Sequence, residues 1–159
     1  MNNYLIRKIE TQELLKVINL IKEFAEFEKL SEFCQISEND LREAIFGENH
    51  FVNCLVAESE NALVGYALFF PVFKSFRGER SMFLEDLYIS PKMRGQGLGL
   101  KMLKAVARAA KKQNCVRMDW QALKWNAPAI EFYKKIGAET DNENLDFRLR
   151  GENFVRFAS

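Results

Sequence analysis

The sequence predicts an α/β fold built on a mixed, mostly antiparallel sheet with helices on both faces. The strongest sign is a central unit in which a strand-like run, residues 82–89, leads through a glycine-rich turn to a helix-like run, residues 98–113, and then to a second strand-like run, residues 115–123. A strand–helix–strand unit of this length forms a right-handed parallel crossover. The chain has 159 residues, so we expect a single domain over residues 1–159.

Three strands are expected before the central unit. Residues 4–9 alternate between apolar and polar side chains, which predicts a short strand. Residues 52–58 and 63–73 are rich in apolar side chains and are joined by a polar turn at residues 59–61, which indicates antiparallel pairing. A polar loop is expected over residues 74–80.

Two helices are expected between these strands. Thr11 can cap a first helix whose apolar residues recur at the helical period: Leu14, Val17, Ile18, Ile21, Phe24 and Ala25. Ser37 and Asp40 form a capping-box-like start for a second, short helix. Gly47 would end that helix.

The second half of the chain predicts two further helices and a final strand. The helix over residues 98–113 carries one apolar face, formed by Leu103, Val106, Ala107 and Ala110. Residues 128–136 predict a helix with Pro128 in its first turn. Residues 145–149 alternate and predict a last strand, and Phe154, Val155 and Phe157 are expected to pack as a tail.

Composition indicates an ordinary globular protein and excludes several classes. Hydrophobic residues make up 48% of the chain and charged residues 28%, while a net charge of +1 argues against bulk nucleic-acid binding. No apolar run approaches a membrane span, and the polar start at residues 1–3 does not resemble a secretory signal. The three cysteines, Cys34, Cys54 and Cys115, lie far apart, which indicates reduced thiols and no zinc site. We therefore expect a cytoplasmic protein without a metal, a membrane partner or a nucleic-acid partner.

The glycine-rich turn, Arg94-Gly95-Gln96-Gly97-Leu98-Gly99, predicts an anion site. Alternate glycines allow close approach to the backbone, and the N–H groups that open a helix favour a phosphate. The spacing is one residue short for a P-loop and differs from the G-x-G-x-x-G of a dinucleotide fold. A glycine-rich helix start without a ligand is the alternative.

The spacing Arg94-x-x-Gly97-x-Gly99 resembles the acyl-CoA pyrophosphate loop of the Gcn5-related N-acetyltransferases, the GNAT superfamily. Residues 119–137 resemble the later part of the same fold: a strand, an Asn-containing turn, a helix with a tyrosine, then glycine. With residues 84–88 and 27–30, the pattern is similar to the branch of diamine and polyamine (spermidine/spermine) N-acetyltransferases and thialysine N-acetyltransferases. The resemblance implies a GNAT-like fold with splayed parallel strands, acetyl-CoA as co-substrate and direct acetyl transfer to a small primary amine.

The resemblance also implies which residues meet acetyl-CoA. The loop and helix start would hold the pyrophosphate, backbone donors of the central strand would meet the acetyl oxygen, and the Asn-containing turn would meet the pantetheine arm. The expected residues are Arg94, Gly95, Gln96, Gly97, Leu98, Gly99, Leu100 and Lys101, then Leu87, Tyr88 and Ile89, then Asn126 and Ala129. Lys101 also fits a solvated basic helix face, and Asn126 also fits a simple helix cap.

Two side chains would carry the chemistry. An amine must lose a proton before it attacks, and Glu85 and Asp86 are both candidates to assist. The resemblance favours Glu85, which strand alternation places on one face with Leu87 and Ile89. A salt-bridged carboxylate is the alternative. Tyr133 would donate a hydrogen bond to the departing sulfur, and its alternative is a core aromatic residue.

Substrate residues follow from the same resemblance. A cationic amine would meet carboxylates and aromatic rings, and the expected residues are Phe27, Glu28, Glu85, Asp119, Trp120 and Gln121. Phe27 stands where some members have Tyr, and residues 139–146 depart from the acidic turn of the polyamine enzymes. This leaves short diamines and lysine-like amines open. A homodimer is expected, and a protein or peptide acetyltransferase and a non-catalytic CoA-binding module are the alternatives.

Overall fold

The computed structural model describes residues 4–159, so the polar chain start lies outside the described residues. The described chain divides into two compact units, a first unit that ends at Gln121 and a second unit, Ala122–Ser159. No helix among the described residues is long and apolar enough to cross a membrane.

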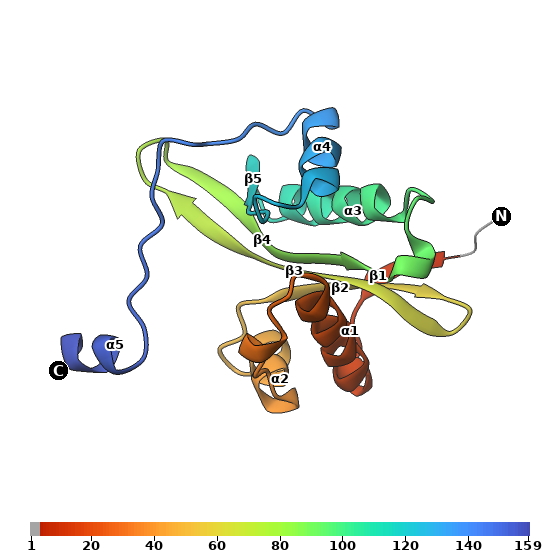
Figure 1. Cartoon of the computed structure of the whole chain (residues 1–159), viewed down its shortest axis with the longest axis horizontal. Helices are drawn as coiled ribbons and strands as arrows, with labels where there is room; N and C mark the ends of the chain where they lie inside the picture. Colours follow the sequence, from red (N-terminus) through yellow and green to blue (C-terminus); the bar gives the residue numbers. More distant parts are fainter. Residues whose placement is uncertain (1–3) are drawn as a thin grey trace. The chain divides into compact units, whose positions relative to one another are not determined.

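The first unit is organised around one five-stranded sheet (Figure 1). Its strands lie in the order in which the chain forms them: β1 (Tyr4–Lys8), β2 (Asn53–Ser59), β3 (Ala62–Lys74), β4 (Glu79–Ile89) and β5 (Arg117–Trp120). All neighbouring pairs are antiparallel except β4 and β5, which are parallel. The predicted mixed, mostly antiparallel sheet is therefore confirmed.

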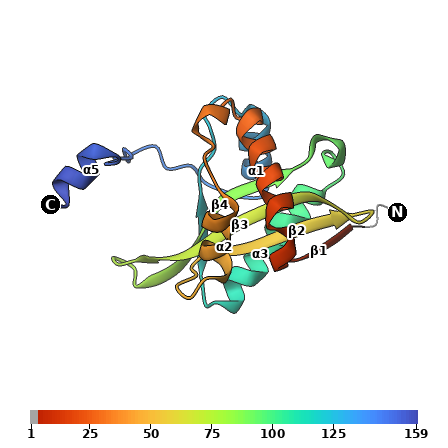
Figure 2. The same cartoon turned by 90° about the horizontal axis from the view of Figure 1, so that it is seen from below.

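Helices cover both faces of this sheet, as predicted. Figures 1 and 2 show α1 (Leu14–Phe27) and α2 (Glu38–Phe46) on one face and α3 (Leu98–Lys112) on the other. Short 3₁₀ turns flank them at Thr11–Glu13, Ser31–Phe33 and Pro91–Met93. The helix α3 connects β4 to β5 and completes the parallel crossover.

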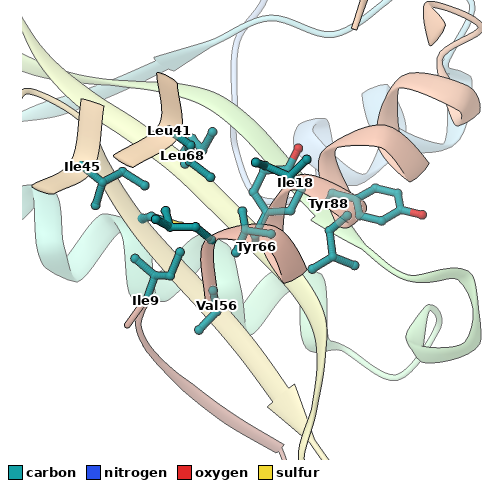
Figure 3. Close-up of a cluster of buried hydrophobic side chains, with 12 residues drawn as sticks. Ile9, Ile18, Leu41, Ile45, Val56, Tyr66, Leu68 and Tyr88 are labelled. Carbon is teal, nitrogen blue, oxygen red and sulfur yellow. The ribbon is translucent and has the colours of Figure 1, made fainter. Parts of the chain in front are cut away.

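The core on the α1 and α2 face combines aromatic and aliphatic side chains from five elements (Figure 3). Tyr66 of β3 and Tyr88 of β4 lie among the aliphatic residues, and their ring centroids are 6.3 Å apart. The labelled aliphatic members are Ile9, Ile18, Leu41, Ile45, Val56 and Leu68. Burial of these chains stabilises the sheet against the two helices, at roughly 1.5–3 kcal/mol for each large side chain.

The sequence predicted the N-terminal cap of α2 correctly but not that of α1. Ser37 accepts the Asp40 N–H at 3.1 Å, so the predicted cap of α2 is confirmed. The prediction that Thr11 caps α1 was wrong. Thr11 lies inside a 3₁₀ turn, and Glu13 instead accepts the N–H of Glu10 at 2.9 Å. A partly buried ion pair fixes that carboxylate, which is 2.7 Å from Arg7 of β1.

The hairpin of β3 and β4 is longer than the sequence indicated. Cross-strand pairing continues to Lys74 and Glu79, so the predicted polar loop shrinks to residues 75–78. The edge strand β5, which pairs with β4, is only four residues long. Pairing with a neighbouring strand, which local composition does not encode, decides both lengths.

The second unit contains α4 (Ala127–Lys135) and α5 (Glu152–Phe157). The predicted strand at residues 145–149 was wrong, because these residues form no ladder with another described strand. The packed tail was wrong as well. The three tail residues Phe154, Val155 and Phe157 belong to α5 and are 55%, 65% and 82% exposed.

Candidate active site

The glycine-rich turn between β4 and α3 forms an open backbone surface. Gly95 and Gly97 have φ angles of +75° and +78°, a conformation that strongly favours glycine. A Cβ at either position would meet no heavy atom within 4 Å, so the surface above them is open. No side chain caps α3, and a helix leaves its first N–H groups without intrahelical acceptors. The turn is therefore suited to an anionic group such as a pyrophosphate.

Arg94 connects this turn to the end of α1. Its Nε donates to the carbonyl oxygen of Ile89 at 2.8 Å. Its guanidinium lies 4.6 Å from the ring centroid of Phe27 and 5.4 Å from that of Tyr88. Two residues predicted for different roles, Arg94 for the cofactor and Phe27 for the substrate, thus come into contact. Lys101 differs, because its ammonium lies over the ring of Tyr4, 4.6 Å from the centroid.

The strand β4 contains a bulge at Glu85. Leu84 pairs with Phe69 and Asp86 pairs with Leu68, so Glu85 has no partner of its own in β3. The prediction of uninterrupted alternation through this strand was wrong, because a bulge inserts one residue and re-aims the side chains around it. Glu85 is exposed.

The strand β5 pairs with β4 only as far as Leu84 and Trp120. Residues 86–89 of β4 continue to pair with β3 on their other side. Alternate backbone groups of this stretch therefore face a side where no strand of the first unit pairs with them. The predicted backbone donors Leu87, Tyr88 and Ile89 belong to this stretch, which lies beyond the last residue pair with β5.

Asp86 is a partly buried carboxylate that sequence reasoning set aside. Its Oδ2 accepts a hydrogen bond from the hydroxyl of Tyr66 at 2.8 Å. Burial raises the pKa of Asp86 to about 6; the Tyr66 hydrogen bond opposes this shift, and the negative charges of Glu85 and Glu28 add to it. Tyr66, a tyrosine within an apolar strand, was the feature of the sequence that could have pointed to Asp86. A buried hydroxyl needs a hydrogen-bond partner.

Two carboxylates, those of Glu85 and Glu28, thus act electrostatically on Asp86 in the first unit. Glu85 and Asp86 come from β4, and Glu28 follows the last residue of α1. Burial raises the pKa of Glu28. Negative charges near the partly buried Asp86 favour a cation beside it.

The carboxylate of Asp119, predicted as a substrate residue, forms ion pairs and a hydrogen bond within the protein. It pairs with Arg117 at 2.5 Å and with Lys74 at 3.7 Å, and it accepts a hydrogen bond from Ser81 at 2.5 Å. Burial acts to raise the pKa of Asp119, but the hydrogen bonds from Arg117 and Ser81 outweigh it and hold the pKa below its usual value. Trp120 closes β5, and Gln121 follows it in an exposed position.

The remaining predicted residues belong to the second unit. Asn126 caps α4, because its Oδ1 accepts the N–H of Ala129 at 3.4 Å. Tyr133 lies on the same helix, and its ring centroid is 5.3 Å from that of Phe132. Among the described residues of both units, no three His, Cys, Asp or Glu side chains are grouped as a metal site would require.

Comparisons with known proteins give this geometry a family context. Residues 15–138 match the acetyltransferase (GNAT) family. The chain is 41% identical over 158 residues to thialysine N-epsilon-acetyltransferase of Mus musculus, covering 92% of each protein. It is 30% identical over 145 residues to spermidine/spermine N(1)-acetyltransferase-like protein 1 of Homo sapiens, covering 87% of this chain and 21% of that protein. A solved integron cassette protein of V. cholerae matches with a TM-score of 0.81 at 28% identity, over 99% of this chain and 98% of that chain.

Proposed function

Because the chain belongs to the acetyltransferase (GNAT) family, we propose that it transfers an acetyl group from acetyl-CoA to a primary amine of a small cationic substrate. Thialysine or a polyamine fits this description, since relatives of the chain carry those substrates in their names, and a diamine has the same cationic amine chemistry. The observation that carries the proposal is the Asp86 carboxylate of the first unit, on which the negative charges of Glu85 and Glu28 act. They give a protein of near-zero net charge a locally negative site.

Acetyl-CoA fits the open glycine turn. Backbone N–H groups of residues 95–100 would hold the pyrophosphate, and the positive end of α3 would favour its charge. Arg94, fixed against Phe27 and Ile89, would add a positive charge beside the turn. Asn126 and Ala129 would meet the pantetheine arm, as the family resemblance implies.

The acetyl transfer requires a free amine, a stabilised oxyanion and a departing thiolate. The substrate ammonium gives a proton to Glu85, directly or through water, and its lone pair then attacks the thioester carbon. Those backbone N–H groups among residues 87–89 that face away from β3 would stabilise the negative oxygen that forms there. The C–S bond breaks as the carbonyl re-forms, and Tyr133 donates a hydrogen bond to the departing thiolate.

The decisive experiment measures CoA release with a panel of amines. We expect thialysine and short diamines to exceed a neutral monoamine of equal length in kcat/KM by about one to two decades, because a second ammonium gains roughly 1–3 kcal/mol from a partly desolvated carboxylate. The advantage shrinks with added salt, because partly exposed charges are screened. A preference for a lysine-containing peptide would favour protein acetylation, and CoA binding without turnover would favour a binding module.

Glu28→Gln provides a second readout of the same panel. The variant should reduce the diamine advantage more than it reduces monoamine turnover, because it removes a charge and keeps the shape. Glu32→Gln, an exposed change in the neighbouring 3₁₀ turn, is the matched control and should leave the ratio unchanged. Equal losses with both substrates would contradict a role of Glu28 in holding the second ammonium.

We also propose a cytoplasmic homodimer. Free cysteines, two of them buried, support a reducing compartment. The dimer is supported by exposed apolar side chains in the second unit, since single chains rarely leave so many together. These residues are Leu145, Phe147, Leu149, Phe154, Val155 and Phe157.

A further inference from the structure

The hydrogen bond between Tyr66 and Asp86 is not required by the core alone. Tyr66 is 0% exposed, and its register partners are Val56 on β2 and Tyr88 on β4. Phenylalanine would fill the same volume without a polar atom. A carboxylate in a partly buried position costs free energy unless its partners compensate. The pair therefore suggests a role outside packing.

The surroundings of Asp86 are mostly acidic or neutral. Glu85 lies beside it on β4, Glu28 acts on it from the end of α1, and the thiol of Cys54 on β2 interacts with it electrostatically. Cys34, which follows the second 3₁₀ turn, interacts electrostatically with Tyr66. Among residues 4–159, Tyr66 is the one hydrogen-bond donor to Asp86, and it engages Oδ2.

We propose that Tyr66 is a positioning residue for amine binding: its hydroxyl fixes the Asp86 carboxylate, whose second oxygen, Oδ1, holds an ammonium group of the substrate. The inference rests on the proposed function and extends it, because it assigns the ammonium to Asp86 and leaves proton removal to Glu85. No bond is made or broken in this step. A cation beside Asp86 relieves the repulsion that Glu28 and Glu85 exert on its carboxylate.

A pH dependence follows from this arrangement. Asp86 holds an ammonium only when ionised, and burial raises its pKa to about 6. The Tyr66 hydroxyl opposes that shift by donating to the ionised form. Removing it raises the pKa of Asp86 further, by about one unit for a hydrogen bond to a charged group. As the pH falls, Asp86 of the variant then becomes protonated at a higher pH than in the native protein, and the ammonium site is lost earlier.

The test is Tyr66→Phe, measured with butane-1,4-diamine across pH 5.5–8.5. We expect the acid limb of kcat/KM to move up by about one unit, so that the variant is about fivefold worse than the native protein at pH 6 and nearly equal at pH 8.5. The loss should fall on KM, with kcat within about twofold at saturation. A loss of kcat/KM of equal size at every pH would overturn the proposal, because simple destabilisation of the fold would not shift the acid limb of the pH profile.

Two further variants make the test specific. Ile45→Val in α2 removes one methyl group from the same core without touching Asp86, and it should leave the acid limb in place. Asp86→Asn can still accept the hydroxyl hydrogen but cannot ionise, so adding Tyr66→Phe to it should cause no pH-dependent loss. If the double variant still shows the shifted limb, Asp86 is not the group that titrates and the proposal fails.

A titration without turnover separates this inference from the proposed function. The ¹³C chemical shift of the Asp86 carboxyl should titrate near pH 6 in the native protein and about one unit higher in Tyr66→Phe. Diamine affinity at pH 6, measured by calorimetry, should fall about fivefold in the variant. Unchanged midpoints and affinities would overturn the proposal even in an active acetyltransferase, whereas failure to acetylate any amine would overturn the proposed function alone.

Discussion

Glu85 and Asp86 are adjacent in the sequence, yet the fold gives them different environments. Glu85 is the exposed residue of a bulge, and Asp86 is partly buried with its Oδ2 bound by Tyr66. The sequence identified both as candidate acids. It could not distinguish them, because a bulge depends on the register of two strands and leaves no local signature here.

Tyr133→Phe tests a single hydroxyl. The variant keeps the ring that contacts Phe132 and removes the donor, so we expect kcat to fall by roughly 10²–10³ with little change in thermal stability. Steady-state kinetics with the best amine give the measurement. Phe132→Leu is the matched control for packing on α4 and should retain kcat within about threefold. Near-native kcat in Tyr133→Phe would identify Tyr133 as a structural aromatic residue.

Glu13 predicts an acid-sensitive term in stability. Arg7 donates hydrogen bonds to Glu13 and lowers its pKa from 4.5 to about 2. Because the folded-state pKa is depressed, the stabilisation is complete above about pH 4.5 and is lost as the pH falls toward 2. Glu13→Gln should lower the free energy of unfolding by about 2 kcal/mol at pH 7.

Urea unfolding of both proteins at pH 7 and at pH 2.5 measures this term. The difference between native protein and variant should narrow at the lower pH, where the native carboxylate begins to protonate. Glu38→Gln removes an exposed ion pair with Arg42 and should cost less than about 1 kcal/mol at either pH. A constant difference across the pH range would assign the effect to packing.

At the scale of elements, the β4–α3 turn gives a direct test of cofactor binding. Gly97→Val places a β-branched residue at a φ of +78°, on the surface where the pyrophosphate would lie. We expect the dissociation constant for acetyl-CoA, measured by calorimetry, to rise at least about tenfold, or ~1.4 kcal/mol. Gly78→Val, at a φ of +63° in the β3–β4 turn, carries the same backbone strain elsewhere and should bind normally. Equal affinities of the two variants for acetyl-CoA would show that the β4–α3 turn does not bind the cofactor.

Element type was predictable where local chemistry decides it. The cap at Ser37 and the helical period of α1 and α3 are properties of neighbouring residues, and the structure confirms them. The strand expected at residues 145–149 was wrong, although its alternation is a fair strand pattern. A strand also needs a partner, and a pattern cannot supply one.

At the scale of the whole molecule, the exposed apolar chain from residue 145 to residue 157 predicts self-association. We expect two 18.5-kDa chains to associate, as measured by light scattering coupled to gel filtration. Phe147 is 92% exposed, and Phe147→Glu should shift the protein toward monomer if that segment forms the interface. Phe76→Glu is the control, at a fully exposed site in the β3–β4 turn. A native monomer, or a dimer that survives Phe147→Glu, would contradict this assignment.

The sequence by itself determined the family and the class of fold. Glycines at alternate positions before α3, and the apolar periods around them, are local features, and the family match over residues 15–138 agrees with the resemblance that they indicated. The tertiary structure alone decided which carboxylates interact: Glu28 and Asp86 lie 58 positions apart, and a tyrosine from a third element fixes one of them. The physical reason is that caps and turns depend on near neighbours, whereas burial, register and charge coupling depend on residues that only folding brings together.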